Sequence, residues 1–198
     1  MRITRFPLCT LLSLLSMLAL SISCSQEEST TSPNIIYILA DDLGYGDVSA
    51  MNPDAAWKTT HIDRIAEEGI RFTDAHTGSA VCTPTRYGVL TGRYSWRSSL
   101  KEGVLWSWDP PLIQQNETTV ASLLQEQGYA TACVGKWHLG LGWQYHAEDP
   151  DSADFSKPVT GGPTSLGFDY FFGITASLDI PPYVYIENDL STRVPLDY

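Results

Sequence analysis

A continuous apolar run near the start of the chain limits the fold more than any other feature of the sequence. It occupies NIIYILADD, residues 34–42, and ends in two adjacent acids, Asp41 and Asp42. Apolar residues that continue without alternation are typical of a strand buried on both faces of a parallel sheet. We therefore expect a strand here with two carboxylates at its carboxyl end.

Helical and strand patterns alternate along the rest of the chain. Helices are predicted over residues 60–69, 83–92 and 119–127, and strands over residues 70–74 and 129–134. Such alternation predicts an α/β fold with a mainly parallel sheet flanked by helices. In a sheet of this kind, ligands collect outside the carboxyl ends of the strands, so the residues that follow each strand are the first candidates for a site.

The amino-terminal residues are typical of an exported protein. Arg2 and Arg5 precede a short apolar run over residues 11–22, which is typical of a secretory signal peptide and is too short to span a bilayer. The small residues before Cys24 are similar to a bacterial lipoprotein cleavage site. Ordinary secretion, with Cys24 as an unmodified thiol, is the alternative.

These features divide the chain into three segments. We expect residues 1–23 to be a signal peptide, residues 24–32 a polar tether and residues 33–198 one folded domain. The protein would then lie in the periplasm or at the cell surface, where a lipid at Cys24 would attach it to the outer membrane. The net charge of −11 argues against nucleic acid as a partner, and an anion would need a local cationic or metal centre to bind.

Two cysteines remain after export. Cys9 leaves with the signal peptide and Cys24 is the candidate lipid site, which leaves Cys82 and Cys133. In an oxidising compartment such a pair predicts a disulfide. A functional thiol at residue 82 is the other interpretation.

Two polar clusters follow predicted strands. Asp41 and Asp42 would repel each other unless a hard divalent cation such as Ca²⁺ or Mg²⁺ bound them, and a turn cap is the alternative interpretation. Lys136 and His138 follow the strand over residues 129–134 and would point the same way on an extended segment. That pair suits the binding of an oxyanion and the transfer of protons, and a basic surface loop is its alternative.

Cys82 directly precedes a predicted helix. Thr83 is its predicted N-cap, and Pro84 is the first helical residue, where the missing N–H costs nothing. The free N–H groups and positive dipole at this end suit an anion or a thiolate, and Arg86 one turn later would stabilise negative charge. A nucleophile in an anion pocket therefore has a physical basis here; a plain cysteine nucleophile or a structural disulfide remain the other interpretations.

These motifs together resemble the signature of the type I sulfatases, the arylsulfatase-like family whose signature cysteine is converted to formylglycine. The matching segments are residues 33–44, 60–72, 82–86, 90–93 and 135–140. The resemblance covers nearly all of residues 33–189, and one departure is Thr85, where serine is commoner.

The resemblance implies an alkaline-phosphatase-like sulfatase fold and hydrolysis of a sulfate ester, with a sulfated carbohydrate or an aryl sulfate as substrate. It implies that a formylglycine-generating maturation enzyme converts Cys82 to 3-oxoalanine (formylglycine), which then attacks sulfur. The residues that it implies are Cys82, Arg86, Lys136 and His138 in catalysis, Ser177 in sulfate binding, and Asp41, Asp42 and Cys82 as ligands of Ca²⁺.

The matching segments represent only the N-terminal part of the family's catalytic domain. The later half of that domain brings further calcium ligands and basic groups, and no matching segment is found here. We therefore expect an incomplete domain, and little sulfatase activity from the 198-residue chain by itself. A phosphoester or phosphonate hydrolase of the same superfamily and a truncated, non-catalytic protein are the alternative functions. Trp106, Trp108 and Tyr183 are aromatic candidates for glycan contact that the sequence does not rank.

Overall fold

The computed structural model describes residues 32–147 and 152–194. By its internal contacts the chain divides into two units, Met1–Ala40 and Asp41–Tyr198. The predicted signal peptide, Cys24 and all of the tether except Ser32 lie outside the described residues. No helix among the described residues has the length and apolar character needed to cross a membrane.

The apolar run near the start of the sequence forms no strand in the described structure. Residues 32–40 are neither helix nor strand. Ile36 and Ile38 are 84% and 80% exposed, and Ile35 and Tyr37 at the alternate positions are exposed as well. The prediction of a buried strand over residues 34–42 is therefore wrong for this structure, because a buried strand needs neighbours that pair its backbone and cover its faces.

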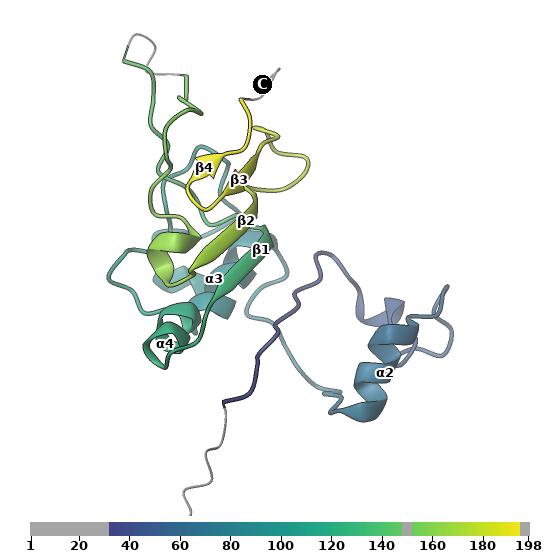
Figure 1. Ribbon diagram of the computed structural model, residues 1–198. Coiled ribbons are helices and arrows are strands. Elements are labelled where there is room, and N and C mark those ends of the chain that lie inside the picture. Colours follow the sequence, from purple (N-terminus) through teal and green to yellow (C-terminus); the bar gives the residue numbers. More distant parts are fainter. Residues whose placement is uncertain (1–31, 148–151, 195–198) are drawn as a thin grey trace, which may run out of the picture. The chain divides into compact units, whose positions relative to one another are not determined.

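Four strands form one sheet in the order β1-β2-β3-β4 (Figure 1). They are β1 (Ala132–Lys136), β2 (Tyr170–Ile174), β3 (Tyr185–Glu187) and β4 (Leu190–Ser191). β1 and β2 run parallel, with Lys136 opposite Ile174, whereas β3 and β4 continue the sheet in antiparallel fashion. The α/β class is confirmed, and the two antiparallel additions make the described sheet mixed.

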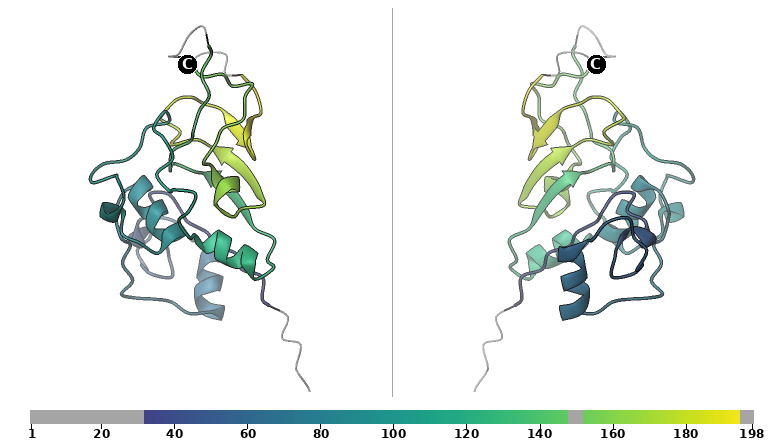
Figure 2. Two further views of the ribbon diagram at one scale, coloured as in Figure 1. Left: turned by 90° about the vertical axis from the view of Figure 1, so that its left-hand side faces the viewer. Right: turned by 90° about the vertical axis from the view of Figure 1, so that its right-hand side faces the viewer.

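The three predicted helices are confirmed to within one or two residues at each end. The described helices are α2 (Thr60–Glu68), α3 (Cys82–Thr91) and α4 (Val120–Glu126), with short 3-10 helices η1 (Tyr45–Asp47), η2 (Ser95–Arg97) and η3 (Pro163–Leu166). α3 ends at Gly92, whose φ of 65° is left-handed, and Thr119 caps α4 by accepting the N–H of Ser122. The predicted strand over residues 70–74 is wrong, since that segment is an exposed loop. Figures 1 and 2 show α4 beside the end of β1 at which the chain enters the sheet.

β1 begins three residues later than predicted because the chain first closes α4. The N–H of Tyr129 donates to the carbonyl of Leu124 at 3.1 Å and so belongs to the end of the helix. The strand then continues to Lys136, two residues beyond the predicted end. Lys136 is therefore a strand residue, and its side chain has a fixed direction.

One cluster of buried apolar side chains holds α3, the strands and the loops between them. Trp137 packs edge-on against Phe171 of β2, with ring centroids 6.3 Å apart. The cluster consists of Tyr87, Leu105, Leu112, Ile113, Trp137, Leu139, Leu141, Trp143, Ala153, Phe155, Val159, Leu166, Phe171, Val184 and Ile186. It brings Tyr87 of α3 and Trp137, which follows β1, into one core.

Asp169 ties the end of α4 to the entry of β1 and gives the fold a pH dependence. Its carboxylate accepts the N–H of Thr131 at 2.8 Å and the side-chain amide of Gln125 at 2.7 Å. These hydrogen bonds lower the pKa of Asp169 from its ordinary value of 3.8, and the bond from the backbone N–H of Thr131 has the largest effect. A carboxyl with a lowered folded-state pKa stabilises the fold above its ordinary pKa, and this stabilisation is lost as the pH falls through the lowered value.

We therefore expect Asp169→Asn to flatten the acid side of the stability profile. Thermal unfolding of wild type and variant between pH 2 and pH 7 should show a steeper acid loss of Tm for wild type below about pH 4. Glu126→Gln, which removes an exposed carboxylate of α4, is the control and should keep the wild-type slope. Equal acid slopes for Asp169→Asn and wild type would contradict the assignment.

Candidate active site

α3 begins at Cys82 itself, one residue earlier than predicted. Thr83, the predicted N-cap, lies inside the first turn, and Val81 takes the cap position without a side-chain hydrogen bond. The Thr83 hydroxyl cannot cap the helix because it is used elsewhere. It donates to the carbonyl of His138 at 2.9 Å and accepts the N–H of Leu105 at 3.2 Å. Cys82 still lies at the positive end of a helix, where negative charge is favoured.

The ammonium group of Lys136 is the centre of the candidate site. Its Nζ lies 3.1 Å from Sγ of Cys82, 2.9 Å from Oδ2 of Asp41 and 3.2 Å from Oγ of Ser177. The side chain reaches these atoms from the last position of β1 and is only 11% exposed. A single cation therefore joins three residues that were predicted for three different roles.

Arg86 brings a second cation from the same helix as Cys82. Its guanidinium donates to Asp41 Oδ2 at 2.9 Å and to the carbonyl of Lys136 at 2.7 Å. Its side chain is 14% exposed, and its buried Nε has no hydrogen-bond partner among the described residues. Two cations thus share one carboxylate, which leaves net positive charge beside Cys82 for an anion to bind.

The pKa values of this cluster keep it charged. The hydrogen bond from Lys136, aided by the charges of Lys136 and Arg86, lowers the pKa of Asp41 from 3.8 although burial acts in the opposite direction. Burial acts to lower the pKa of Lys136, but the hydrogen bonds and charges of Asp41 and Cys82 outweigh it and raise that pKa above 10.5. At neutral pH the site therefore contains an ammonium, a guanidinium and a carboxylate.

His138 does not continue the extended segment of Lys136, although the sequence predicted it. β1 has ended, and His138 has a left-handed φ of 55° and is buried. Its Nε2 lies 2.7 Å from the carbonyl oxygen of Leu105, which only accepts, so Nε2 carries the hydrogen and Nδ1 is the free acceptor. Nδ1 is buried with no partner among the described residues. Burial, the largest influence, lowers the pKa of His138 from 6.5 and favours the neutral ring.

The described residues offer the type of donor atom that a calcium ion prefers, but fewer donor atoms than it needs. Asp41 and Asp42 supply hard oxygen atoms, while Ca²⁺ takes six to eight oxygen ligands. The backbone of Asp42 is left-handed, with φ of 56°, and its side chain makes no hydrogen bond or ion pair with the described residues. No group of three or more His, Cys, Asp or Glu side chains arranged to hold a metal occurs in the described part of the chain.

Cys82 and Cys133 are free in this structure, so the predicted disulfide is not formed. Cys133 lies in the middle of β1 and packs against the core, and burial raises its pKa to about 11. Its thiol is therefore protonated at neutral pH. Cys82 instead faces Lys136, as its hydrogen bond shows.

Sequence reasoning missed the part that Thr83 and Leu105 play in the site. Thr83 connects the start of α3 to the backbone of residues 105 and 138. Leu105 contributes through its backbone N–H and carbonyl alone, which no side-chain pattern could reveal. Asp179, which the sequence offered as a residue facing the substrate, accepts a hydrogen bond from Ser177, and this bond is the largest influence that lowers its pKa from 3.8.

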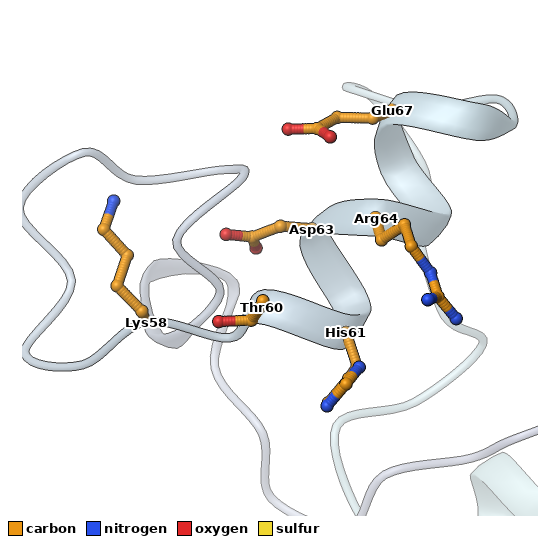
Figure 3. Close-up of a pocket in the computed structure, with 6 residues that line it drawn as sticks. All are labelled: Lys58, Thr60, His61, Asp63, Arg64 and Glu67. Carbon is orange, nitrogen blue, oxygen red and sulfur yellow. The ribbon is translucent and has the colours of Figure 1, made fainter.

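A separate polar hollow lies on α2 and contains none of the predicted site residues. Its lining residues are Lys58, Thr60, His61, Asp63, Arg64 and Glu67 (Figure 3). Figure 3 shows Asp63 and Glu67 on one side of the helix and His61 and Arg64 on another. Asp63 is already engaged by Ser49 and Thr59, so the hollow offers mixed charge without a free cluster of one sign.

The chain belongs to the sulfatase family. The Sulfatase family model matches residues 33–192. The chain has the N-terminal part of the alkaline-phosphatase-like sulfatase fold, as the motifs implied.

Individual relatives agree with this assignment. An N-acetylgalactosamine-6-O-sulfatase of Bacteroides thetaiotaomicron is 43% identical over 184 residues, which is 90% of this chain and 34% of that protein. Arylsulfatase G of Rattus norvegicus is 41% identical over 160 residues, which is 80% of this chain and 27% of that protein. The chain thus spans about a third or less of the length of these curated relatives.

Solved structures match over a similar extent. One comes from work on the metabolism of multiple glycosaminoglycans by Bacteroides thetaiotaomicron and superposes with a TM-score of 0.71 at 45% identity, covering 81% of this chain and 32% of its own. Another, Ps i-CgsB in complex with k-i-k-neocarrahexaose, has a TM-score of 0.61 at 29% identity over 74% of this chain and 29% of its own.

Proposed function

We propose that the complete gene product hydrolyses sulfate esters on a carbohydrate, with residue 82 as the nucleophile after its conversion to formylglycine. The observation that carries the proposal is the contact of Lys136 Nζ with Cys82 Sγ at 3.1 Å, in a cluster that also holds Asp41, Arg86 and Ser177. Membership of the sulfatase family supports the reaction class. Conversion of Cys82 requires a formylglycine-generating enzyme as a partner.

The chain's own residues would bind the sulfate group and stabilise its charge. The thiol sulfur of Cys82 stands where the oxygen of the modified residue would lie, so Lys136 would donate to that oxygen. Arg86 and the N-terminal end of α3 add positive potential at the same point. Ser177, whose Oγ accepts from Lys136 Nζ at 3.2 Å, would turn its hydroxyl hydrogen from Asp179 to a bound sulfate oxygen.

His138 would accept a proton within this site. Its pKa is lowered chiefly by burial, so the ring is neutral at pH 7, and its Nδ1 is the unprotonated nitrogen. Leu105 holds the ring in this tautomer through the bond to Nε2. A neutral imidazole with one free acceptor is the state required of a general base.

Asp41 and Asp42 would supply part of a calcium site, which other ligands must complete. A bound Ca²⁺ would contribute charge stabilisation at the sulfate and at the nucleophile. Export to the periplasm or cell surface, with a lipid at Cys24, completes the proposal and rests on the signal-like residues 1–23.

A sulfated sugar is the substrate class that the relatives favour. One relative is called an N-acetylgalactosamine-6-O-sulfatase, and one solved relative was crystallised with neocarrahexaose. We therefore take 6-O-sulfo-N-acetylgalactosamine as the first substrate to test on the complete protein.

We expect matured complete protein to release sulfate from 4-nitrophenyl sulfate and from the sulfated sugar, and to act far more slowly on 4-nitrophenyl phosphate. The 198-residue chain alone should show little turnover, because its described residues do not complete the metal site. Release of sulfate and nitrophenol is the measurement, and the mass of the peptide containing residue 82 reports the modification. Faster turnover of phosphate would favour the phosphoester hydrolase, and an unmodified thiol with no turnover would favour a non-catalytic protein.

A further inference from the structure

The backbone of Leu105 is fixed to both sides of the candidate site. Its N–H donates to the Thr83 hydroxyl at 3.2 Å, and its carbonyl accepts from His138 Nε2 at 2.7 Å. The Thr83 hydroxyl in turn donates to the His138 carbonyl at 2.9 Å. These three bonds form a closed ring of buried groups, and Thr83 is the residue next to Cys82. The residue after Leu105 therefore has a fixed backbone position close to the nucleophile.

That next residue, Trp106, begins a turn that is held on several sides. Its N–H donates to the Asp109 carboxylate at 2.6 Å, and its carbonyl accepts the N–H of Asp109 at 3.1 Å. The carbonyl of Asp109 accepts the N–H of Leu141 at 3.2 Å, and the carbonyl of Ser107 accepts the indole N–H of Trp143 at 2.8 Å. These bonds fix the backbone of the turn.

The two tryptophans of this turn have different environments. Trp108 packs against Trp143 and Phe155, with ring centroids 5.5 Å and 6.3 Å away. Trp106 is 63% exposed and makes no ring contact with the described residues. Trp108 is therefore a packing residue and Trp106 an exposed indole, a difference that the sequence does not reveal.

We infer that Trp106 is a substrate-binding residue that stacks on the apolar face of the sulfated sugar ring. This inference rests on the proposed function and extends it from the sulfate to the sugar. The cations bind the sulfate group but contribute nothing to the recognition of the ring that carries it. An exposed indole supplies a large apolar surface at low entropic cost, and Trp106 directly follows Leu105, whose backbone is bonded to Thr83 and His138.

Binding without turnover tests this inference. In the complete protein with Cys82→Ala, we expect Trp106→Ala to raise the Kd of 6-O-sulfo-N-acetylgalactosamine about tenfold, equivalent to about 1.4 kcal/mol. The Kd of inorganic sulfate, which probes the anion site alone, should stay within about twofold. Trp106→Phe should keep most of the affinity for the sugar, because a ring remains. Titration calorimetry measures all of these constants.

Trp57→Ala is the matched control, since Trp57 is also 63% exposed but has no hydrogen-bonded link to Thr83 or His138. Unchanged affinity of Trp106→Ala for the sugar, together with sulfatase activity of wild type, would overturn the role of Trp106 alone. An equal loss of sugar and sulfate binding would show a structural role instead and would also overturn it. A parent protein that binds sulfate but not the sulfated sugar would contradict both the substrate class and the inference.

Discussion

Replacing Lys136 by glutamine should lower kcat of the complete, matured protein on 4-nitrophenyl sulfate by about 10³-fold. Lys136 Nζ is within 3.2 Å of the atoms of Cys82, Asp41 and Ser177, so one substitution removes the cation that all three share. Removal of one preorganised donor from a site that stabilises developing negative charge costs about 10²–10³-fold in rate. We place Lys136 at the upper end of this range because the lost group also carries full charge.

The decrease should appear in kcat more than in KM. Arg86 and the start of α3 remain in the variant and continue to attract the sulfate, while the charge that develops in the transition state loses its nearest cation. Steady-state kinetics with 4-nitrophenyl sulfate separates the two constants, and the mass of the residue-82 peptide confirms that maturation is unaffected.

Lys157→Gln serves as the control, because Lys157 is an exposed lysine outside the cluster. It should leave both constants within about twofold of wild type. If Lys136→Gln retained more than about a tenth of the wild-type kcat, with residue 82 fully modified, the central position of Lys136 would be refuted.

Local sequence signals predicted those parts of the structure whose causes are local. The turn glycine at residue 92 and the cap at Thr119 define helix ends through their own backbone geometry and hydrogen bonds. The short spacing from Cys82 to Arg86 likewise places both on the first turns of α3. Lys136 reaches them because β1 ends beside the start of that helix.

Features that depend on distant partners could not be read from the sequence. Thr83 resembles a helix cap, yet its hydroxyl bonds to the backbone 55 and 22 residues away. The apolar run over residues 34–42 has the pattern of a buried strand, yet it forms no strand in the described structure. In both cases the local pattern is the usual one for the predicted role. Whether the segment takes that role depends on which distant groups the rest of the fold brings near it.

Gly173→Ala should destabilise the protein by about 3 kcal/mol, which is at the upper end of the cost of overpacking. Gly173 lies in β2 opposite Gly135 of the parallel strand β1. A Cβ at residue 173 would overlap the carbonyl oxygen of Gly135, and would lie 2.8 Å from its carbonyl carbon and 2.9 Å from Cε2 of Phe171. The obstacle is mainly backbone, which cannot rotate away as a side chain would, so the strands must separate.

Separation of the strands would also displace the active site, because Gly135 directly precedes Lys136. We therefore expect urea unfolding of Gly173→Ala to show a lower midpoint, and the folded fraction to show reduced sulfatase activity. Gly46→Ala is the control, since a Cβ there would meet only the side chain of Asn52 at an ordinary 3.6 Å. An unfolding free energy for Gly173→Ala within about 0.5 kcal/mol of wild type would show that β1 and β2 tolerate the added carbon, and that the close approach of their backbones does not position Lys136.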